Sequence, residues 1–353
     1  MKDYKAGKWC LKSVYIPVLT TFLTFIFFSE CNTTEPPIDN TEPGRRDYVW
    51  TVDTLKVPEG RSIPYWMWGS SANNVWAVGL SYLNAYCIWH YNGQSWNNYN
   101  PDKYIDPGGI CGFNSNDIWI GSTDGALWHY NGAEWSKFTV INIPNYHSFF
   151  VQGISGSSPN NIYAVGFADS IDGSTYKAII VHYNGTKWVQ VNIPTVKNSF
   201  TEIQYAKNTN EFLIKGNVFE NSIEFIYKFN GIDLIELVNN SSNSEDISLN
   251  TIGSEVYLAW QGKIYRYENS KLNLFKDFSE IQYAGKVWGR TEKDFFTINW
   301  DGIGHYNGTD LITIYKKWND DWFPGGGIVF EKDVFLIWDD SYNTFIVHGK
   351  LMN

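Results

Sequence analysis

Cysteine is scarce in this chain: there are four among 353 residues, and no two of them form a Cys-x-x-Cys pair. Its absence removes the commonest pattern of a structural zinc site, and we expect neither a metal nor a cofactor. Basic residues are also in the minority, with 27 Lys and Arg against 37 Asp and Glu. Because phosphate neutralisation dominates binding to nucleic acids, an acidic chain of this kind is a poor nucleic-acid partner.

Long apolar runs are missing too, with one exception near the N-terminus. Residues 14–28 are almost uncharged and apolar, and they follow the lysines at 2, 5, 8 and 12. This run is too short for an ordinary transmembrane helix and is typical of the core of a secretory signal. We therefore expect residues 1–30 to be a signal peptide.

Cys31 stands directly after this segment, and its position resembles that in a bacterial lipoprotein signal. The resemblance implies that Cys31 is lipidated and becomes the mature N-terminus, although Glu30 departs from the usual small residue before it. The alternatives are an ordinary secretory signal and an uncleaved anchor. Residues 31–46, rich in Thr, Glu, Pro and Asn, are predicted to be a flexible tether. The expected location is the bacterial cell envelope, at the outer membrane or cell surface, with the lipid as the only membrane contact.

The remaining residues, 47–353, contain a short pattern that recurs at about the interval of a propeller blade. The clearest copies lie at 74–96, 117–135 and 161–188, and each combines an apolar strand with a His-Tyr-Asn-Gly segment and a later Trp. Asn-Gly between alternating strands is a strong signal for a tight hairpin, here predicted as a two-residue turn. Four short antiparallel strands per repeat describe a β-propeller blade.

The later copies are weaker but keep the same phase. Those at 211–231 and 255–269 have lost most of the motif, and the copy at 294–308 recovers it. The seventh copy lacks a fourth strand, which residues 48–52 can supply because Trp50 matches the position of Trp96, Trp135 and Trp188. We predict an all-β, single β-propeller of seven four-stranded blades, closed by the N-terminal strand so that no sheet edge is exposed. Six or eight blades are the alternatives.

The repeat unit resembles those of bacterial envelope lipoproteins of unassigned function. It is similar, more distantly, to the propellers of photosystem-assembly factors and two-component sensor proteins. The resemblance covers residues 48–353 and implies the fold. Because such repeats carry many different activities, it implies little about function.

Most histidines and tryptophans are predicted to belong to the scaffold. Five of the six histidines occupy one repeated position, so the ring spreads them apart and they cannot form a metal or catalytic cluster. The tryptophans at repeated positions are expected to pack blade against blade. Cys87 and Cys111 have two interpretations, a disulfide or two small buried hydrophobic side chains.

Binding residues are therefore expected elsewhere, on the face that carries the longer and more varied connections at 80–86, 100–108, 139–150, 167–178, 191–200, 238–250 and 315–327. Variable loops on a rigid scaffold are where binding residues gather. The predicted ligand-binding residues are Tyr82, Tyr86, Tyr104, Asp106, Tyr146, His147, Asp169, Tyr176, Trp318, Asp320, Asp321 and Trp322. The acidic and aromatic segment 318–322, followed by Pro324 and three glycines, is the least repeat-like part of the chain.

Three functions fit these residues. The first is a non-catalytic binding module, a monomer with a protein or glycan ligand and no catalytic residues. The second is an envelope glycoside hydrolase or polysaccharide lyase, which would need carboxylates converging at the channel mouth; Asp106, Asp169, Asp320 and Asp321 are the candidates. The third is a structural or assembly component. No phosphate-binding loop, dinucleotide fingerprint or Gly-x-Ser-x-Gly motif is present in the sequence.

Overall fold

The computed structural model describes residues 44–58, 60–81, 86–99, 104–196, 198–218, 223–240, 247–281, 283–317 and 323–352. All of these belong to one compact unit. No helix occurs among them, and so no helical membrane span either. The predicted signal peptide, Cys31 and almost all of the predicted tether lie outside the described residues.

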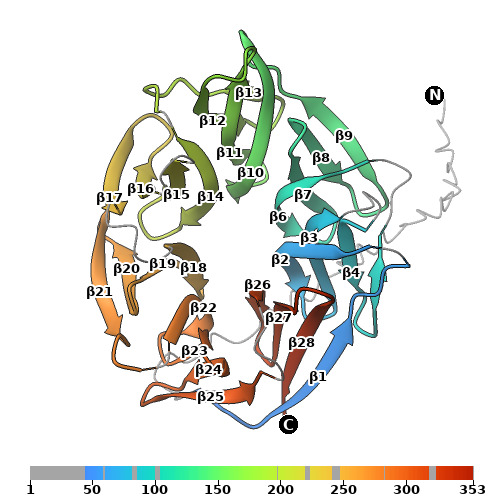
Figure 1. Ribbon diagram of the computed structural model, residues 1–353, viewed down its shortest axis with the longest axis vertical. Helices are drawn as coiled ribbons and strands as arrows, with labels where there is room; N and C mark the ends of the chain where they lie inside the picture. The colour runs from blue at the N-terminus through green and yellow to red at the C-terminus, as the bar shows by residue number, and fades with distance from the viewer. Residues whose placement is uncertain are drawn as a thin grey trace, which may run out of the picture. The chain divides into compact units, whose positions relative to one another are not determined.

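The strands form antiparallel sheets arranged around a centre (Figure 1). Three sheets follow the three clear sequence copies. They are β2 (Ser62–Ser71), β3 (Asn74–Ser81), β4 (Ile88–Tyr91) and β5 (Trp96–Asn98); β6 (Pro107–Asn114), β7 (Asp117–Ser122), β8 (Ala126–Tyr130) and β9 (Trp135–Val140); and β10 (Tyr146–Ser158), β11 (Asn161–Ser170), β12 (Tyr176–Tyr183) and β13 (Trp188–Gln190).

The next two copies also form four-stranded units, despite their weak motifs. The strands are β14 (Ser199–Ala206), β15 (Glu211–Val218), β16 (Ile223–Phe229) and β17 (Leu234–Asn240), then β18 (Ser248–Ile252), β19 (Glu255–Trp260), β20 (Lys263–Glu268) and β21 (Lys271–Asp277). The sixth unit consists of β22 (Tyr283–Thr291), β23 (Asp294–Asn299), β24 (Gly302–Tyr306) and β25 (Leu311–Lys316). A short parallel pairing between β18 and β22, Thr251 with Trp288 and Ile252 with Gly289, joins it to β18–β21 in one sheet. A count of seven blades requires this eight-stranded sheet to be divided at the parallel pairing.

The last sheet joins the two ends of the described chain, as the sequence predicts. β26 (Phe323–Val329), β27 (Asp333–Asp339) and β28 (Thr344–Leu351) are completed by β1 (Tyr48–Thr54), which pairs antiparallel with β28. Trp50 lies opposite Gly349, as Trp96, Trp135 and Trp188 lie opposite the tyrosines of their own sheets. An added Cβ on Gly349 would lie 2.6 Å from the Trp50 ring, so the glycine makes room for the indole.

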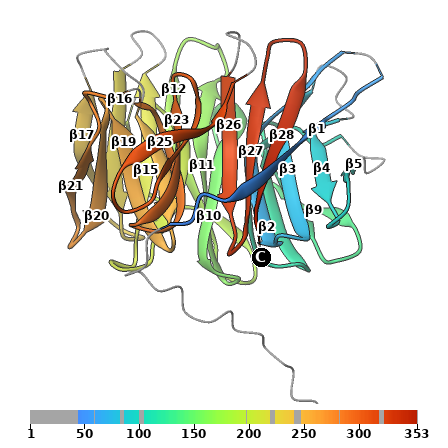
Figure 2. The same cartoon turned by 90° about the horizontal axis from the view of Figure 1, so that it is seen from below.

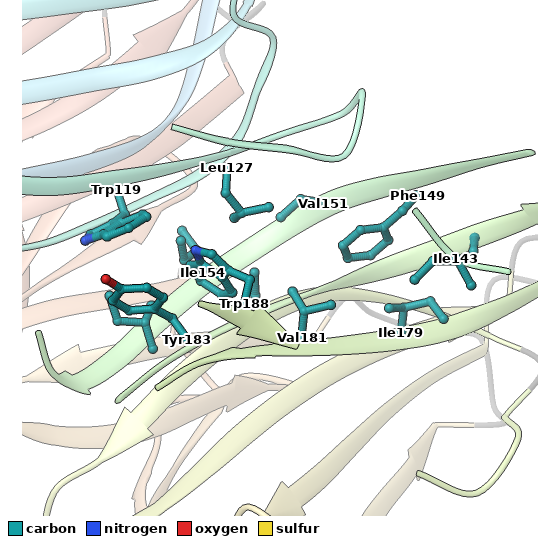
Figure 3. Close-up of a cluster of buried hydrophobic side chains, with 13 residues drawn as sticks. Trp119, Leu127, Ile143, Phe149, Val151, Ile154, Ile179, Val181, Tyr183 and Trp188 are labelled. Atoms are coloured by element: carbon teal, nitrogen blue, oxygen red, sulfur yellow. The ribbon is translucent and has the colours of Figure 1, made fainter. Parts of the chain in front are cut away.

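The repeated aromatic residues form the contacts between neighbouring sheets. The ring centroids of Trp76 and Trp135 are 5.7 Å apart, and so are those of Trp119 and Trp188. Figure 3 shows one such core, in which Trp119 and Leu127 of one sheet face Val181 and other side chains of the next. Cys87 and Cys111 are both free, and burial raises the thiol pKa of Cys87 to about 12. The prediction of packing between blades is confirmed, and no disulfide joins Cys87 and Cys111.

Each repeated histidine is fixed by two neighbours in its own sheet. Its Nε2 lies 2.7–2.8 Å from the Asn or Asp that begins the second strand of the sheet. Its ring packs on the aromatic side chain two residues further on, as His90 does on Trp76 at 4.2 Å between ring centroids. In the weak copy at 211–231, Lys228 takes the place of the histidine and lies 4.0 Å from Glu211. These histidines are therefore structural.

The hairpin turns differ from the predicted two-residue form. Asn92 is followed by three more residues before β5 begins, and its Oδ1 accepts hydrogen bonds from the backbone N–H groups of Gln94 and Ser95, both at 3.0 Å. The asparagine side chain thus closes a four-residue turn. Gly132 adopts the left-handed φ of +93° in the equivalent turn, and an added Cβ there would lie 2.4 Å from Asn116 Oδ1.

Two faces result from this topology. The lower face carries the turns between the first and second and between the third and fourth strands of each sheet, together with the C-terminal end of β28. The upper face carries the second-to-third connections, including the one between β27 and β28, and the connections to the next sheet (Figure 2). Gly44 lies on the lower face, where its N–H donates to the carbonyls of Lys293 and Asn307.

Candidate functional site: the channel mouth and the upper face

The inner strands surround a central channel. Its middle is a narrow cavity of about 180 Å³ that opens on the upper side into a wider cavity of about 520 Å³, which we call the channel mouth. The channel mouth is lined by Tyr65, Trp66, Leu80, Pro107, Gly108, Thr123, Val151, Gln152, Thr201, Glu202, Lys215, Asn217, Glu224 and Lys286. Its volume is in the range of small-molecule sites.

In one ion pair of the channel mouth, both charged groups are bonded to each other and to the backbone. Lys215 Nζ lies 2.7 Å from Glu224 Oε1 and donates to the carbonyl of Ile247 at 2.5 Å. The other Glu224 oxygen accepts the N–H of Ile247 at 2.5 Å, and the residue is 8% exposed. Because both charges are paired and bonded to the backbone, this pair anchors the segment that leads into β18.

Other polar groups of the channel mouth have weaker contacts or none. Glu202 Oε1 is 3.9 Å from Lys215 Nζ, and Oε2 accepts only a long hydrogen bond of 3.4 Å from the N–H of Leu249. Thr201 Oγ1 and Asn217 Oδ1 are buried and have no hydrogen-bond partner. Buried polar atoms are normally hydrogen-bonded, but the indole nitrogens of the scaffold residues Trp76 and Trp135 are buried without a partner too, so these two oxygens do not by themselves indicate a ligand.

Lys286, on β22, also lines the channel mouth. Its Nζ donates to the carbonyls of Pro324 and Gly325, both at 3.0 Å. The charged side chains that line the channel mouth are two Glu and two Lys, so its formal charge is zero.

None of the sequence-predicted residues that the structure describes lines this channel mouth. Tyr82, Trp318, Asp320, Asp321 and Trp322 are not among the described residues. The other seven predicted residues are on the upper side, but none of them lines the cavity at the centre or at the mouth of the channel. They are Tyr86, Tyr104, Asp106, Tyr146, His147, Asp169 and Tyr176.

Four of these residues lie in strands, although the sequence places them in long loops. β10 and β11 extend to Tyr146 and Ser170, and β12 starts at Tyr176, so the predicted loops 139–150 and 167–178 shrink to 141–145 and 171–175. Their alternation of polar and apolar residues continues the hairpin beyond the core. Tyr146, His147, Asp169 and Tyr176 therefore occupy the upper ends of strands.

Local contacts already engage several of these side chains. Lys177 Nζ stands 4.3 Å from the centroid of the Tyr146 ring, and Ser148 Oγ is 2.8 Å from His147 Nδ1. Asp169 and Tyr176 are opposite each other on β11 and β12. The Asp106 carboxylate accepts a hydrogen bond from Thr123. Asp106 and Asp169 thus come from separate sheets, and neither reaches the channel cavities.

The glycine run after Pro324 has a structural reason. Instead of continuing a loop, residues 323–329 form the inner strand β26. An added Cβ on Gly326 would lie 2.6 Å from the carbonyl oxygen of Tyr65, and one on Gly327 would lie 2.4 Å from Leu336. The glycines allow inner strands to approach each other closely.

Large exposed apolar side chains are distributed unequally between the faces. Among the described residues outside strands, five lie on upper-face connections: Tyr104, Ile171, Ile281, Trp300 and Tyr342. Phe323, which begins β26 on the same face, is 61% exposed. We call these six the upper-face apolar residues. On the lower face the exposed apolar residues outside strands are Ile232 and Met352, and four more, Val49, Val189, Ile235 and Ile312, are each the second residue of a strand that starts there.

The sequence did not predict the residues that line the channel mouth, because several of them come from a weak copy of the repeat. Thr201, Glu202, Asn217 and Glu224 lie on β14–β16, where the motif gives no alignment to the clear copies. One signal was available. Lys215 directly follows the apolar residues 212–214, at a position that Val78 and Val165 occupy in two of the clear copies. A charge at such a buried strand position needs a partner.

The chain is similar in fold to solved β-propellers. A structure described as YCF48 bound to D1 peptide has a TM-score of 0.57 and 13% identity, with 89% of this chain and 100% of that one covered. The Swd1 β-propeller domain of Myceliophteria thermophila has a TM-score of 0.55 and 9% identity, with 86% of this chain and 100% of that one covered. The extracellular domain of a putative hybrid two-component system of B. thetaiotaomicron has a TM-score of 0.52 and 11% identity, with 85% of this chain and 40% of that one covered. No protein-family model and no curated protein matches the chain. At these identities the similarity shows the fold alone.

Proposed function

We propose that this protein is a non-catalytic binding module that docks a protein partner on its upper face. The observation that carries the proposal is the concentration of exposed apolar side chains there. Aromatic residues are enriched at protein interfaces, and a rigid ring with apolar side chains on its connections can hold a partner without changing shape. The fold is compatible with such a role, since one similar structure is YCF48 bound to D1 peptide.

The hydrolase alternative has less support from the described residues. Of its four predicted carboxylates, Asp320 and Asp321 lie outside them, and Asp106 and Asp169 do not line the channel. Glu224 of the channel mouth already forms an ion pair with Lys215 and accepts a hydrogen bond from the N–H of Ile247. Glycoside hydrolysis needs two carboxylates that can reach the substrate, and Glu202 is left as a single one.

We also propose that the chain is held at a membrane through lipidated Cys31. The support is the signal-like sequence before Cys31 and the polar segment after it. Incorporation of a labelled fatty acid into the native chain, and its loss in Cys31→Ser, would test the anchor.

Photo-crosslinking from the two faces tests the docking proposal. A photoreactive amino acid replaces Trp300 on the upper face or Ile232 on the lower face of the full-length chain, in the cells that produce it. We expect a discrete protein adduct from position 300 that is absent from position 232. Equal adducts from both positions, or none from position 300 in a folded protein, would reject upper-face docking.

A further inference from the structure

The residues directly before β1 cross the lower end of the sixth unit, β22–β25. Gly44 N–H donates to the carbonyl oxygens of Lys293 and Asn307, at 2.9 and 3.2 Å. The strand that follows, β1, pairs with β28 of the neighbouring sheet (Figure 1). Residues 44–47 therefore connect two sheets on the lower face, and we call them the N-terminal strap.

The N-terminal strap covers one of the repeated histidines. An added Cβ on Gly44 would lie 2.9 Å from Cε1 of His305 and 2.8 Å from Oδ1 of Asp294, so the glycine backbone packs directly on this pair. The side chain of His305 is 0% exposed, whereas those of the equivalent His129 and His348 are 26% and 12% exposed. The strap thus closes off a repeat position that stays partly open to solvent in other sheets.

The closed position suits the neutral imidazole. His305 Nε2 lies 2.8 Å from Asp294 Oδ1, but Nδ1 is buried and has no hydrogen-bond partner. A proton added to Nδ1 would be a buried donor without an acceptor, which is costly. Two guanidinium groups are also close. Arg46 Nη2 donates to the His305 carbonyl at 2.9 Å and pairs with Asp310 at 2.8 Å, and Arg290 Nη1 lies 3.0 Å from Asp294.

His305 is the group of this cluster whose charge changes in mild acid. Burial lowers the pKa of His305, an effect that Asp294 opposes and that Arg46 and Arg290 reinforce. Against the effect of burial, the hydrogen bond from His305 and the charge of Arg290 lower the pKa of Asp294, so this carboxylate stays ionised. Burial raises the pKa of Tyr48, whose ring centroid is 6.1 Å from that of His305, to about 12, so the phenol stays neutral.

From this geometry we infer that the N-terminal strap is an acid-sensitive contact, closed over neutral His305 and released from the lower face when His305 is protonated. In the released form Nδ1–H reaches water, and Asp294 remains beside the imidazolium as its partner. β1 keeps its own pairing with β28, so the ring stays closed. The inference goes beyond the proposed docking of a protein partner, because it concerns the opposite face and a different set of residues.

The expected size of the effect follows from proton linkage. The closed form has the lowered pKa, and in the released form the imidazole titrates near its ordinary pKa of about 6.5. Closure is therefore most favourable above about pH 6.5 and is lost as the pH falls below it. The ratio of released to closed strap should rise about tenfold between pH 7.5 and pH 5.5.

Hydrogen exchange of the full-length chain, followed by mass spectrometry at these two pH values, tests the strap. Exchange rates are corrected for the intrinsic effect of pH, so that they report local opening. We expect residues 44–48 to exchange about tenfold faster at pH 5.5, while the buried strand β7 changes much less. His305→Gln keeps an N–H that can donate to Asp294 and does not titrate, so it should remove the pH effect. His348→Gln, at the equivalent position of the last sheet, is the matched control and should retain it.

Gly44→Val tests the same contact without changing a histidine. Its side chain would overlap His305 and Asp294, so residues 44–48 should exchange at pH 7.5 at least as fast as those of the native chain at pH 5.5. The inference would be overturned if corrected exchange of the native strap is equal at both pH values, or if the pH effect survives His305→Gln or disappears in His348→Gln. Parallel loss of protection in β7, or a closed strap in Gly44→Val, would also contradict it.

Discussion

The lower and upper faces of this propeller are built from the same strands but use their residues differently. On the lower face, turns repeat with little variation, and asparagine, aspartate and histidine side chains bond to one another or to the backbone. The upper face exposes Trp300 and Tyr342 and leaves buried oxygens of the channel mouth without partners. The comparison teaches that repetition marks the scaffold, whereas departures from the repeat mark the candidate binding face.

The largest effect is expected from breaking a buried charge cluster near the lower face. Asp294 lies 3.0 Å from Arg290 and 2.8 Å from His305, whose side chains are 4% and 0% exposed. Asp294→Ala would leave the Arg290 charge buried without its partner and should lower the free energy of unfolding by about 3–5 kcal/mol. Urea denaturation measures this, with the exposed Glu236→Ala as control. A loss below about 1 kcal/mol would contradict the role of the cluster.

Substitution of one glycine on each face compares how tightly the turns of the two faces are packed. Gly132, in a lower-face turn, has a φ of +93° and no room for a Cβ beside Asn116. Gly173, in the upper-face turn after β11, has a φ of +68° and nothing within 4 Å of an added Cβ. Gly132→Ala should therefore cost about 2–3 kcal/mol, from strain and steric overlap together, and Gly173→Ala about 1 kcal/mol, from strain alone. Thermal denaturation of both variants would refute this account if Gly173→Ala were the more damaging.

Acid should weaken the scaffold through its histidines. Burial lowers the pKa of His305, against the opposing effect of Asp294, and burial also lowers the pKa of His90 and His182. The unfolded chain thus binds protons at a higher pH than the folded chain does, and stability should fall as the pH drops below about 6.5. His305→Gln should reduce this slope between pH 7 and pH 5 in denaturation experiments. An unchanged slope in the variant would show that His305 does not contribute.

Much of the scaffold could be predicted from the sequence because its signals are local. The Trp50 strand, the repeated histidines and the tryptophan contacts all follow from residues at fixed positions in each copy. Strand ends could not be placed as well, and Tyr146 and Asp169 proved to extend a hairpin. The channel mouth could not be predicted, since Thr201, Glu202 and Lys286 meet only after distant strands converge. The tight packing of Gly325–Gly327 likewise depends on neighbouring sheets that periodicity does not reveal.

The smallest effect on stability, and the largest on binding, is expected from Trp300→Ala. Trp300 is 66% exposed on the upper face, and Ile232 is 79% exposed on the lower face, so the two form a matched pair. Each substitution to Ala should change the free energy of unfolding by no more than about 0.5 kcal/mol.

The most direct test of upper-face binding is the dissociation constant of each variant for the partner identified by crosslinking. Trp300→Ala should weaken binding by about 2 kcal/mol, or roughly thirtyfold, as expected for an aromatic residue at the centre of an interface, and Ile232→Ala should bind like the native chain. Equal affinities for both variants, or a loss confined to Ile232→Ala, would contradict the assignment of the upper face as the binding face.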